Sequence, residues 1–417
     1  MTERLPVLVV GAGQAGLALS QCLTERGIEH LVLEQADRIA PVWSQQRWDS
    51  FTLVSPNWSI QLPGMPYQGP DPDGFIGRDE IVQYLERYAA SFNPPVRLGT
   101  RVTAIDPHDS GSGYLVTTDR GAYRADNVVL ASGLFQQPRV PNWSADLSPD
   151  VLQLHTSQYR RPDALPEGAV LVVGSAQSGC QIAQDLMLAG RKVYLSVGRS
   201  NRAPRRYRGR DLFSWLVQSG FFDRTVAALP APGARFISSP LISGREGGRS
   251  LSLHQFARDG VTLLGHVVGG AGDTLHLAPD LHQSLTQAEM FATNVRKVVD
   301  GFVERSGMDA PLSDEDQQPE SGDGFAAEPL ERLNLREEHV STIIWGSGYR
   351  FDFSLVHLPV LDAGGFPSQD DGATAFAGLY FHGMPWLPKM KSGLLFGAAE
   401  DAERLASRLH DRVRNGG

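Results

Sequence analysis

The stretch Val7-Leu8-Val9-Val10-Gly11-Ala12-Gly13-Gln14-Ala15-Gly16 decides the fold of this 417-residue chain. Its apolar, β-branched beginning predicts a buried strand, and the apolar run after Gly16 predicts a helix. A Gly-x-Gly-x-x-Gly turn between a strand and a helix is typical of dinucleotide binding. Gly11 permits the tight turn, Gly13 lets the backbone approach a pyrophosphate, and Gly16 lets the helix pack closely on the strand.

An acidic residue follows this turn at the expected distance. The second predicted strand, residues 30–33, ends at Glu34, which lies 18 residues after Gly16. A carboxylate there accepts hydrogen bonds from ribose hydroxyls and repels a 2′-phosphate, so FAD or NAD fits the site and NADP does not. The alternative is a glycine turn without a ligand, which the combination of strand, helix and acid disfavours.

The same pattern returns 163 residues after Gly11, where an apolar run (169–173) leads into Gly174-Ser175-Ala176-Gln177-Ser178-Gly179 and a predicted helix. Ala176 replaces the middle glycine and adds a methyl group where phosphates should approach, so we expect looser binding or a shifted pose. The next predicted strand (192–197) ends without an acid and is followed by Arg199. A guanidinium there suits a 2′-phosphate, so NADPH is the expected ligand.

Further arginines follow Arg199 at positions 205, 206, 208 and 210. Arg205 is predicted as a second cofactor ligand, and the alternative for the whole run is a solvated loop. The aromatic-rich segment 211–222 is expected to form a buried amphipathic helix, with a substrate entrance, a dimer contact or a membrane surface as alternatives.

Two strand ends carry small residues where the chain must pass close to a cofactor: Ala131-Ser132-Gly133 and Ser347-Gly348. A strand over 378–383 and an amphipathic helix from about 393 to 412 return the chain to the first unit. We therefore predict an α/β fold with two Rossmann-like domains. The FAD-binding domain comprises residues 1–164 and 330–417, and the NADPH-binding domain (165–329), which ends in an acidic loop (312–328), is inserted into it.

Composition excludes several classes of protein. The net charge of -9 and the pI near 5.7 argue against nucleic-acid binding. No apolar run approaches the roughly 18 residues of a membrane span, and the N-terminus lacks a signal-peptide pattern, so a cytoplasmic protein is expected. Cys22 and Cys180, each expected at the start of a helix, form no Cys-x-x-Cys, and no metal-ligand spacing is present, so neither disulfide chemistry nor a metal site is predicted.

The two nucleotide units, with Ala131-Ser132-Gly133 and Ser347-Gly348-Tyr349-Arg350 at the strand ends, resemble the class B flavin-containing monooxygenases over nearly the whole chain. One signature departs from that family, which carries Phe-x-Gly-x-x-x-His-x-x-x-Tyr/Phe between the units. Here His155 and Tyr159 match, while Pro149 and Val151 do not. This disfavours the Baeyer-Villiger branch, and His155 is interpreted as a structural linker residue.

The resemblance implies that NADPH reduces FAD, that O₂ adds at flavin C4a, and that the hydroperoxide gives one oxygen atom to a small organic substrate. N-oxygenation, S-oxygenation and Baeyer-Villiger insertion remain open as outcomes. An NADPH oxidase or reductase that passes electrons without oxygenation is the alternative enzyme, and a nucleotide-sensing module is the non-catalytic one. A homodimer is possible.

Two residues are candidates for the chemistry by this resemblance. The amide of Asn57 would hydrogen-bond the oxygenated flavin, and a turn asparagine after Pro56 is the alternative. Lys391 would add positive charge beside the reduced flavin, and a solvent-exposed lysine is the alternative. Trp43, Trp48 and Trp58 would line the site of the flavin and a planar substrate. The alternative is that these rings pack in the core.

The remaining predicted cofactor-binding residues lie in the two glycine turns, beside Glu34, in the expected tryptophan wall and at strand ends: Gln14, Ala15, Gln35, Trp43, Trp48, Val102, Ser175, Gln177, Ser178 and Gly383.

Overall fold

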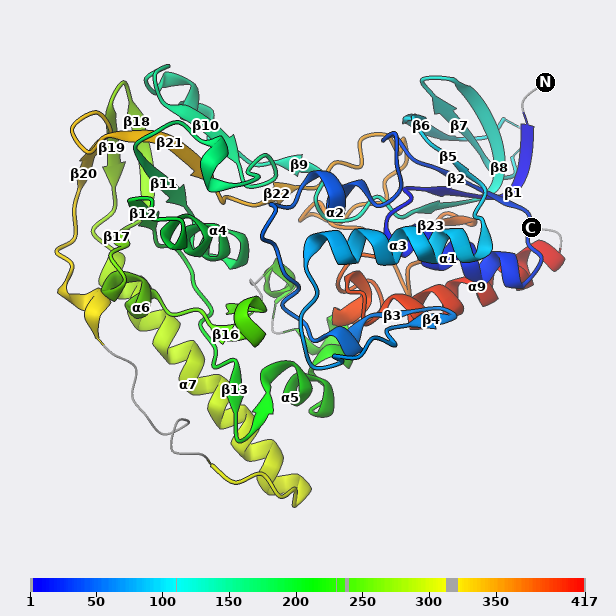
Figure 1. Ribbon diagram of the computed structural model, residues 1–417. Helices are drawn as coiled ribbons and strands as arrows, with labels where there is room; N and C mark the ends of the chain where they lie inside the picture. The colour runs from blue at the N-terminus through cyan, green and yellow to red at the C-terminus, as the bar shows by residue number, and fades with distance from the viewer. Residues whose placement is uncertain (1–2, 110, 230, 237–239, 313–321, 416–417) are drawn as a thin grey trace.

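The computed structural model describes residues 3–109, 111–229, 231–236, 240–312 and 322–415. Two α/β units, each built on a sheet with a parallel core, lie next to each other (Figure 1). This confirms the predicted fold class at the level of Rossmann-like parallel sheets.

The first unit is built on a seven-stranded sheet in the order β5-β2-β1-β8-β7-β6, with β23 also paired to β8. Its strands are β1 (Glu3–Val10), β2 (His30–Leu33), β5 (Val96–Arg97), β6 (Val102–Pro107), β7 (Tyr114–Thr118), β8 (Gly121–Leu130) and β23 (Leu379–Phe381). β5, β2, β1, β8 and β23 run parallel, while β7 is antiparallel to both β8 and β6.

Side chains of β1 alternate between two cores, because successive strand residues face opposite sides of a sheet. Val7 and Val9 pack under the helices α1 (Gln14–Glu25), α3 (Arg78–Phe92) and α9 (Ala398–Arg414). Leu8 and Val10 pack on the other face, against β6, β7 and the segment 353–387. β1 is thus buried on both sides, as its continuous apolar sequence predicts.

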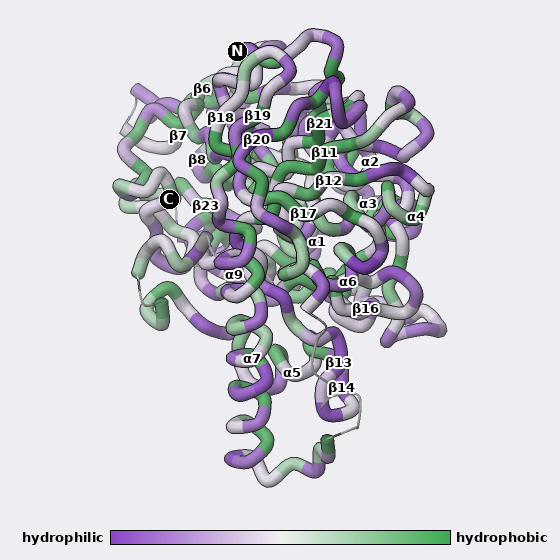
Figure 2. The backbone as a smooth tube through the Cα atoms, turned by 90° about the vertical axis from the view of Figure 1, so that its left-hand side faces the viewer, coloured by the Kyte–Doolittle hydropathy of each residue, from purple (hydrophilic) through white to green (hydrophobic). Residues whose placement is uncertain are grey.

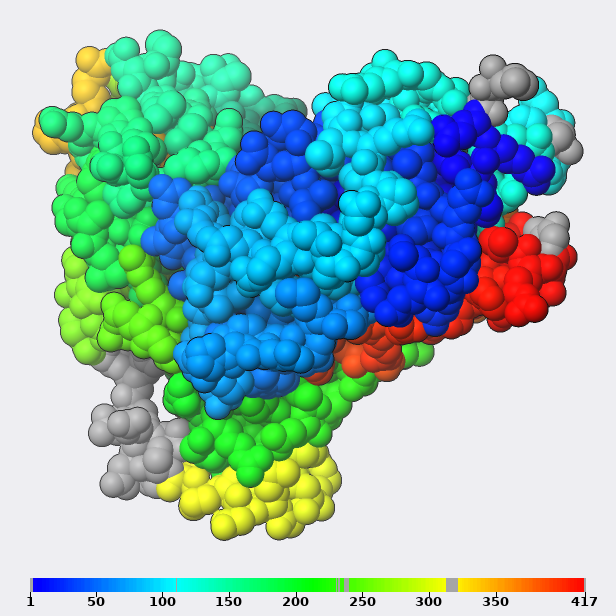
Figure 3. Space-filling model, turned by 45° about the vertical axis from the view of Figure 1, so that its right-hand side comes forward, coloured from blue at the N-terminus to red at the C-terminus, as the bar shows by residue number. Residues whose placement is uncertain are grey.

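The C-terminal segment belongs to this first unit. β23 joins the sheet beside β8, and α9 packs against α1. Figure 3 shows the N-terminal segment in blue and the C-terminal helix in red on the same lobe. The predicted final helix (393–412) is present, although it begins at Ala398.

The second unit has a five-stranded, fully parallel sheet in the order β10-β21-β11-β12-β17. Its strands are β10 (Leu152–His155), β11 (Ala169–Val173), β12 (Val193–Ser196), β17 (Thr262–Leu264) and β21 (Val340–Trp345), with the helices α4 (Gln177–Leu188) and α6 (Leu253–Arg258). β10 and β21 fall outside the predicted range 165–329. Those boundaries therefore need correction, because both flanking segments contribute strands to the second sheet.

A smaller lobe projects from the second unit (Figure 2). It contains the long helix α7 (Leu281–Ser306), α5 (Leu212–Gln218) and the pair β13 (Arg206–Tyr207) and β14 (Arg210–Asp211). The predicted helix over 211–222 is thus shorter than expected. No helix in the described part of the chain is long and apolar enough to cross a membrane.

The remaining elements are short. They are α2 (Pro41–Gln45), β3 (Gln61–Leu62), β4 (Met65–Pro66), β9 (Gln137–Pro138), β15 (Ile242–Ser243), β16 (Arg249–Ser250), β18 (Val267–Ala271), β19 (Thr274–Leu277), β20 (Arg332–Asn334) and β22 (Tyr349–Arg350), with 3-10 turns between them. Most of the predicted acidic loop (residues 313–321) lies outside the described residues.

Candidate functional site

The first glycine turn has no room for side chains at two of its three glycines. Gly11 has φ +109°, and a Cβ there would lie 2.6 Å from the Ala131 carbonyl oxygen. A Cβ at Gly16 would lie 1.9 Å from the Gly11 carbonyl oxygen. The Gly11 N–H donates to the Leu33 carbonyl at 2.7 Å, which fixes the turn to the end of β2.

Gly13 is different, because nothing in the chain requires it to be glycine. Its φ of -77° is available to any residue, and a Cβ there would meet no atom within 4 Å. Gly13 is also the N-cap of α1, and no side chain caps that helix end. Open space in front of free N–H groups at a helix N-terminus fits a phosphate group.

The second turn repeats this geometry. Gly174 has φ +108°, and a Cβ there would lie 2.6 Å from the Gly346 carbonyl oxygen, while a Cβ at Gly179 would lie 1.8 Å from the Gly174 carbonyl oxygen. Ala176 caps α4 with φ -77° and ψ -175°, against -77° and -176° at Gly13. The methyl group of Ala176 therefore causes no backbone strain, and its effect on a ligand stays a prediction.

The residues expected to distinguish the ligands follow each second strand. Glu34 is buried, and its carboxylate accepts hydrogen bonds from the N–H groups of Ala12 and Ala36, both at 2.9 Å. Each carboxylate oxygen still has a lone pair for a ribose hydroxyl. In the second unit Ser175 connects the turn to the segment after the second strand, since its hydroxyl accepts from the Gly198 N–H at 3.0 Å.

Arg199 is exposed at the end of β12 and makes no hydrogen bond or ion pair with any described residue. Its guanidinium is therefore available to a ligand. Two other arginines of this segment are engaged within the protein: Arg202 pairs with Glu289 at 2.6 Å and Arg208 with Asp300 at 2.9 Å.

The side chain of Arg205, predicted as a second cofactor ligand, is engaged inside the protein. Its side chain is 2% exposed, donates to the Val54 carbonyl at 2.6 Å and pairs with Asp211 at 2.7 Å. The guanidinium also stacks over Phe75, 4.1 Å from the ring centroid. Arg205 holds the second unit to the segment around Val54, and this arrangement argues against a role as a phosphate ligand.

The structure also argues against the catalytic role predicted for Asn57. This residue is 2% exposed, and its Oδ1 accepts from the Ile76 N–H at 2.7 Å. Its Nδ2 donates to the Asp71 carbonyl at 2.8 Å. Asn57 fastens the loop 71–76, which corresponds to the alternative of a structural turn asparagine.

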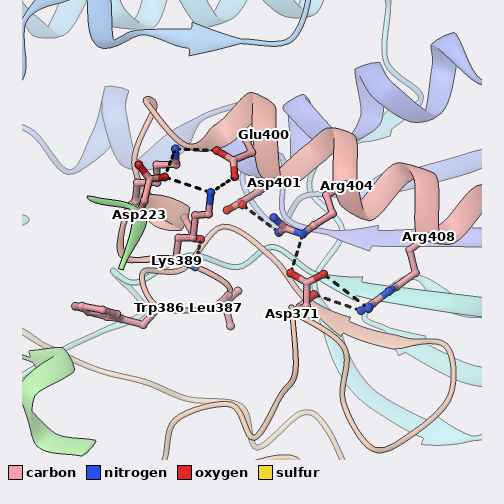
Figure 4. A network of polar contacts seen from close by, with 12 residues as sticks. Asp223, Asp371, Trp386, Leu387, Lys389, Glu400, Asp401, Arg404 and Arg408 are labelled. Carbon is pink, nitrogen blue, oxygen red and sulfur yellow. Dashed lines mark hydrogen bonds and ion pairs between the residues drawn. The ribbon is translucent and has the colours of Figure 1, made fainter. Parts of the chain in front are cut away.

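Lys391 is likewise engaged inside the protein. Its Nζ lies 2.8 Å from Asp223 Oδ1 and 2.7 Å from Glu400 Oε2, and Lys389 contacts the same two carboxylates (Figure 4). Burial by itself would lower the pKa of Lys391, but these two carboxylates outweigh it and raise the pKa. Because two carboxylates balance two ammonium groups, Lys391 offers no net charge to a flavin. Asp223 comes from a segment 168 residues away in sequence, so no local signal could have revealed this pairing.

Gln14 connects three segments at the first turn. Its Nε2 donates to the Gly393 carbonyl at 3.2 Å, and its Oε1 accepts from the Trp43 indole N–H at 3.2 Å. Trp43 therefore lies beside the turn, and its contact with a cofactor stays a prediction. Trp48 is instead buried in the core of the second unit, and Trp58 packs edge-on against Phe213.

The small residues at the strand ends lie in close contact with neighbouring segments. A Cβ at Gly383 would lie 2.2 Å from the Ala15 Cβ, so the C-terminal segment passes directly over α1. The Gly348 carbonyl accepts from His155 Nε2 at 3.0 Å, which gives His155 the structural contact expected of it. Burial lowers the pKa of His155, and the bond to Gly348 partly offsets this.

The other predicted residues fall into three groups. Ser132 and Gly133 both accept from Gln136, Ser347 donates to the Arg139 carbonyl, and Gln177 donates to the Ile242 carbonyl. Val102 is buried in the core of the first unit. Gln35 is exposed and Ser178 is partly exposed.

Comparison with known proteins agrees with this geometry. A family model described as pyridine nucleotide-disulphide oxidoreductase matches residues 8–216. An uncharacterized oxidoreductase of Geobacillus kaustophilus, named CzcO-like, is 33% identical over 409 residues, which cover 97% of this chain and 98% of the relative. The chain belongs to the pyridine nucleotide-disulphide oxidoreductase family.

Other similarities confirm the predicted resemblance to flavin monooxygenases. The probable indole-3-pyruvate monooxygenase YUCCA4 of Arabidopsis thaliana is 32% identical over 179 residues, 43% of each chain. The solved structure of a flavin-containing monooxygenase from Stenotrophomonas maltophilia superimposes with a TM-score of 0.64 at 18% identity, covering 98% of this chain and 99% of that one. Because this structure is only 18% identical in sequence, its similarity shows the fold alone.

The disulphide chemistry in the family name does not fit the cysteines of this member. Cys22 and Cys180 are both free and buried, and they lie in the cores of different units. Burial raises the pKa of both thiols, which disfavours the reactive thiolate. Cys22 lies near the end of α1 rather than at its start as expected, whereas Cys180 is in the first turn of α4.

The glycine turn makes a prediction about two neighbouring substitutions. Gly16→Ala should lower the free energy of unfolding by about 3 kcal/mol, because the new methyl group overlaps the Gly11 carbonyl. Gly13→Ala should cost less than about 1 kcal/mol, as an N-cap change without a clash, yet reduce retention of FAD at least tenfold. Urea unfolding and the flavin content of purified protein measure the two effects. Equal stability losses in both variants would contradict this interpretation.

A second prediction concerns His382, which follows β23 and is fully buried. Its Nε2 has no partner among the described residues, and burial lowers its pKa from 6.5 to about 4. The unfolded chain then binds a proton that the folded chain does not between these values, so stability falls as the pH drops from about 6.5 to about 4. His382→Asn should remove about 2 kcal/mol of the loss in unfolding free energy between pH 7 and pH 4.5. Unfolding free energies at pH 7 and pH 4.5 test it, with exposed His276→Asn as a control that should keep the wild-type difference.

Proposed function

We propose that this protein is an FAD- and NADPH-dependent monooxygenase that transfers one oxygen atom from O₂ to a small organic substrate. FAD would occupy the first glycine turn and NADPH the second, in a nicotinamide-nucleotide unit inserted into the FAD unit. The observation that carries the proposal is the pair of turns with nearly superimposable dihedral angles, one followed by buried Glu34 and the other by unpaired Arg199. Two turns with the same backbone geometry, one followed by a carboxylate and the other by a guanidinium, would bind two different dinucleotides.

The relatives support the same reaction class. The name of YUCCA4 describes a probable indole-3-pyruvate monooxygenase, and the Stenotrophomonas maltophilia protein is a flavin-containing monooxygenase. When bound and reduced, a flavin supplies the activation of O₂ that no side chain can provide. The protein then needs only to bind, orient and shield the two nucleotides.

The residues of this chain divide that work. The free N–H groups at the starts of α1 and α4 would bind the phosphates of the two dinucleotides, and Glu34 has lone pairs left for ribose hydroxyls. Gln14 hydrogen-bonds both Trp43 and Gly393 beside the first turn. It would thereby hold the Trp43 ring in place next to a bound flavin. Proton transfer requires no catalytic dyad here, in line with the absence of one from the sequence motifs.

A second candidate is an NADPH oxidase or reductase that passes electrons on without oxygenating a substrate. The contacts of Asn57 and Lys391 favour it, because both side chains are committed elsewhere and neither is free to stabilise an oxygenated flavin. The two candidates differ in where the electrons from NADPH go.

A substrate panel separates them. Purified FAD-loaded protein is mixed with NADPH and with amines, thioethers, ketones and 2-oxo acids, and NADPH consumption is recorded together with peroxide. A monooxygenase should show substrate-stimulated consumption with little peroxide, and ¹⁸O from ¹⁸O₂ should enter the product. Peroxide in a one-to-one ratio with NADPH for every compound would establish the oxidase instead. Protein that retains no FAD would refute both.

Arg199 provides a prediction about nucleotide choice. Arg199→Gln should weaken NADPH binding about tenfold or more and leave NADH binding unchanged, because a charge-assisted pair with the 2′-phosphate is lost. Titration calorimetry with both nucleotides measures this. Arg206→Gln is the matched control, since the side chain of this exposed arginine of the same run donates to the Gly247 carbonyl and to no other described residue. An equal loss for NADPH and NADH would place Arg199 away from the 2′-phosphate.

A further inference from the structure

Arg47, in the turn after α2, stacks against three aromatic rings. Its guanidinium carbon lies 4.5 Å from the ring centroid of Phe135 and 5.6 Å from those of Trp43 and Phe51. The residue is half-buried. Its flat guanidinium is therefore held in one orientation by the aromatic faces around it.

The polar partners of Arg47 do not balance its charge. Its Nη1 donates to the Gln46 carbonyl at 3.2 Å, and the hydroxyl of Tyr349 is its other polar neighbour. Burial raises the pKa of Tyr349, so the phenol stays neutral at physiological pH. No carboxylate among the described residues lies within ion-pair distance of Arg47, whereas buried Arg202 and Arg205 each have one.

Removing a cation from water without pairing it with an anion raises the free energy of the folded state, and cation–π contacts offset only part of this. Burial accordingly lowers the pKa of Arg47. A guanidinium has five N–H donors in a planar fork, and most of those of Arg47 remain unused. This is the geometry that binds two oxygen atoms of a carboxylate or phosphate.

The position of Arg47 is between the two nucleotide units. Phe135 follows β8 of the first sheet, and Tyr349 follows β21 of the second. Tyr349 also packs edge-on against His155 at the end of β10, with the ring centroids 4.8 Å apart. Carboxyl ends of parallel strands are where ligands bind in open α/β sheets, and Arg47 contacts the segments that follow such ends in both sheets.

We propose that Arg47 binds an oxyanion at the junction of the two units, carried either by a substrate carboxylate or by a phosphate of the nicotinamide dinucleotide. The proposal rests on the proposed function, since it uses the same nucleotide sites. It assigns a ligand to the guanidinium, and in the carboxylate case it makes organic acids the substrate class.

The test measures binding to FAD-loaded protein without turnover. Dissociation constants are determined by calorimetry for NADP⁺, for benzoate and for benzamide, which is uncharged but of similar shape. The variants are Arg47→Gln, Arg47→Lys and the control Arg210→Gln. Arg210 also stacks on an aromatic ring, 5.1 Å from the centroid of Trp215, but lies in the projecting lobe.

A substrate carboxylate predicts that Arg47→Gln weakens benzoate binding at least tenfold and leaves benzamide and NADP⁺ unchanged. A nucleotide phosphate predicts the same loss for NADP⁺ alone. In either case Arg47→Lys should restore part of the affinity, since it keeps the charge but loses the planar fork, and Arg210→Gln should match the wild type.

The proposal is overturned if Arg47→Gln and Arg47→Lys, with wild-type flavin content and thermal unfolding, change neither affinity by more than twofold. It is also overturned if benzoate and benzamide weaken equally, because the guanidinium would then act through shape and not charge. Wild-type protein that retains no FAD would refute the proposed function instead, and that result is visible before any Arg47 variant is compared.

Discussion

Two backbone crossings without room for a Cβ atom organise this protein. Gly11 passes the Ala131 carbonyl and Gly174 passes the Gly346 carbonyl, and in both cases a side chain would overlap the neighbouring strand end. Each crossing brings the end of a first strand, the start of a helix and the end of another strand to one point. The free N–H groups of α1 and α4 are thereby aimed at the carboxyl edges of their sheets, where a phosphate is best held.

The two crossings are held by different groups, and under the proposed function this difference would set the choice of ligand. In the first unit the Glu34 carboxylate bridges the turn and the segment after β2, so the group that holds the turn is itself an anion. In the second unit the neutral hydroxyl of Ser175 holds Gly198, which leaves Arg199 as the charged group at that edge. The same backbone frame thus has opposite electrostatics in its two copies.

Local features of the site could be predicted from the sequence, because turn, helix start and selecting residue lie within a short stretch around Gly11 or Gly174. The tertiary partners could not. Asn57 and Lys391 were predicted from a family resemblance, and their actual contacts come from Ile76 and from Asp223, which no local pattern connects to them. The domain boundaries failed for a related reason: β21 pairs with both β10 and β11 across more than 150 residues of chain, and such pairing leaves no periodicity in any of the three strands.

Charged contacts between the units then determine how freely the two nucleotide sites can move relative to each other. Buried Asp185 of α4 accepts from Ser50 at 2.6 Å and pairs with Arg245 at 3.0 Å, so it ties the first unit to the second through an interior carboxylate. Asp223 pairs with Lys389 and Lys391, but it is 49% exposed, and exposed pairs contribute only about 0–1 kcal/mol each. One contact is therefore firm and the other is weakened by salt. Relative movement of the units should accordingly be smaller near Asp185 than near Asp223, where the C-terminal segment of the first unit meets the second unit.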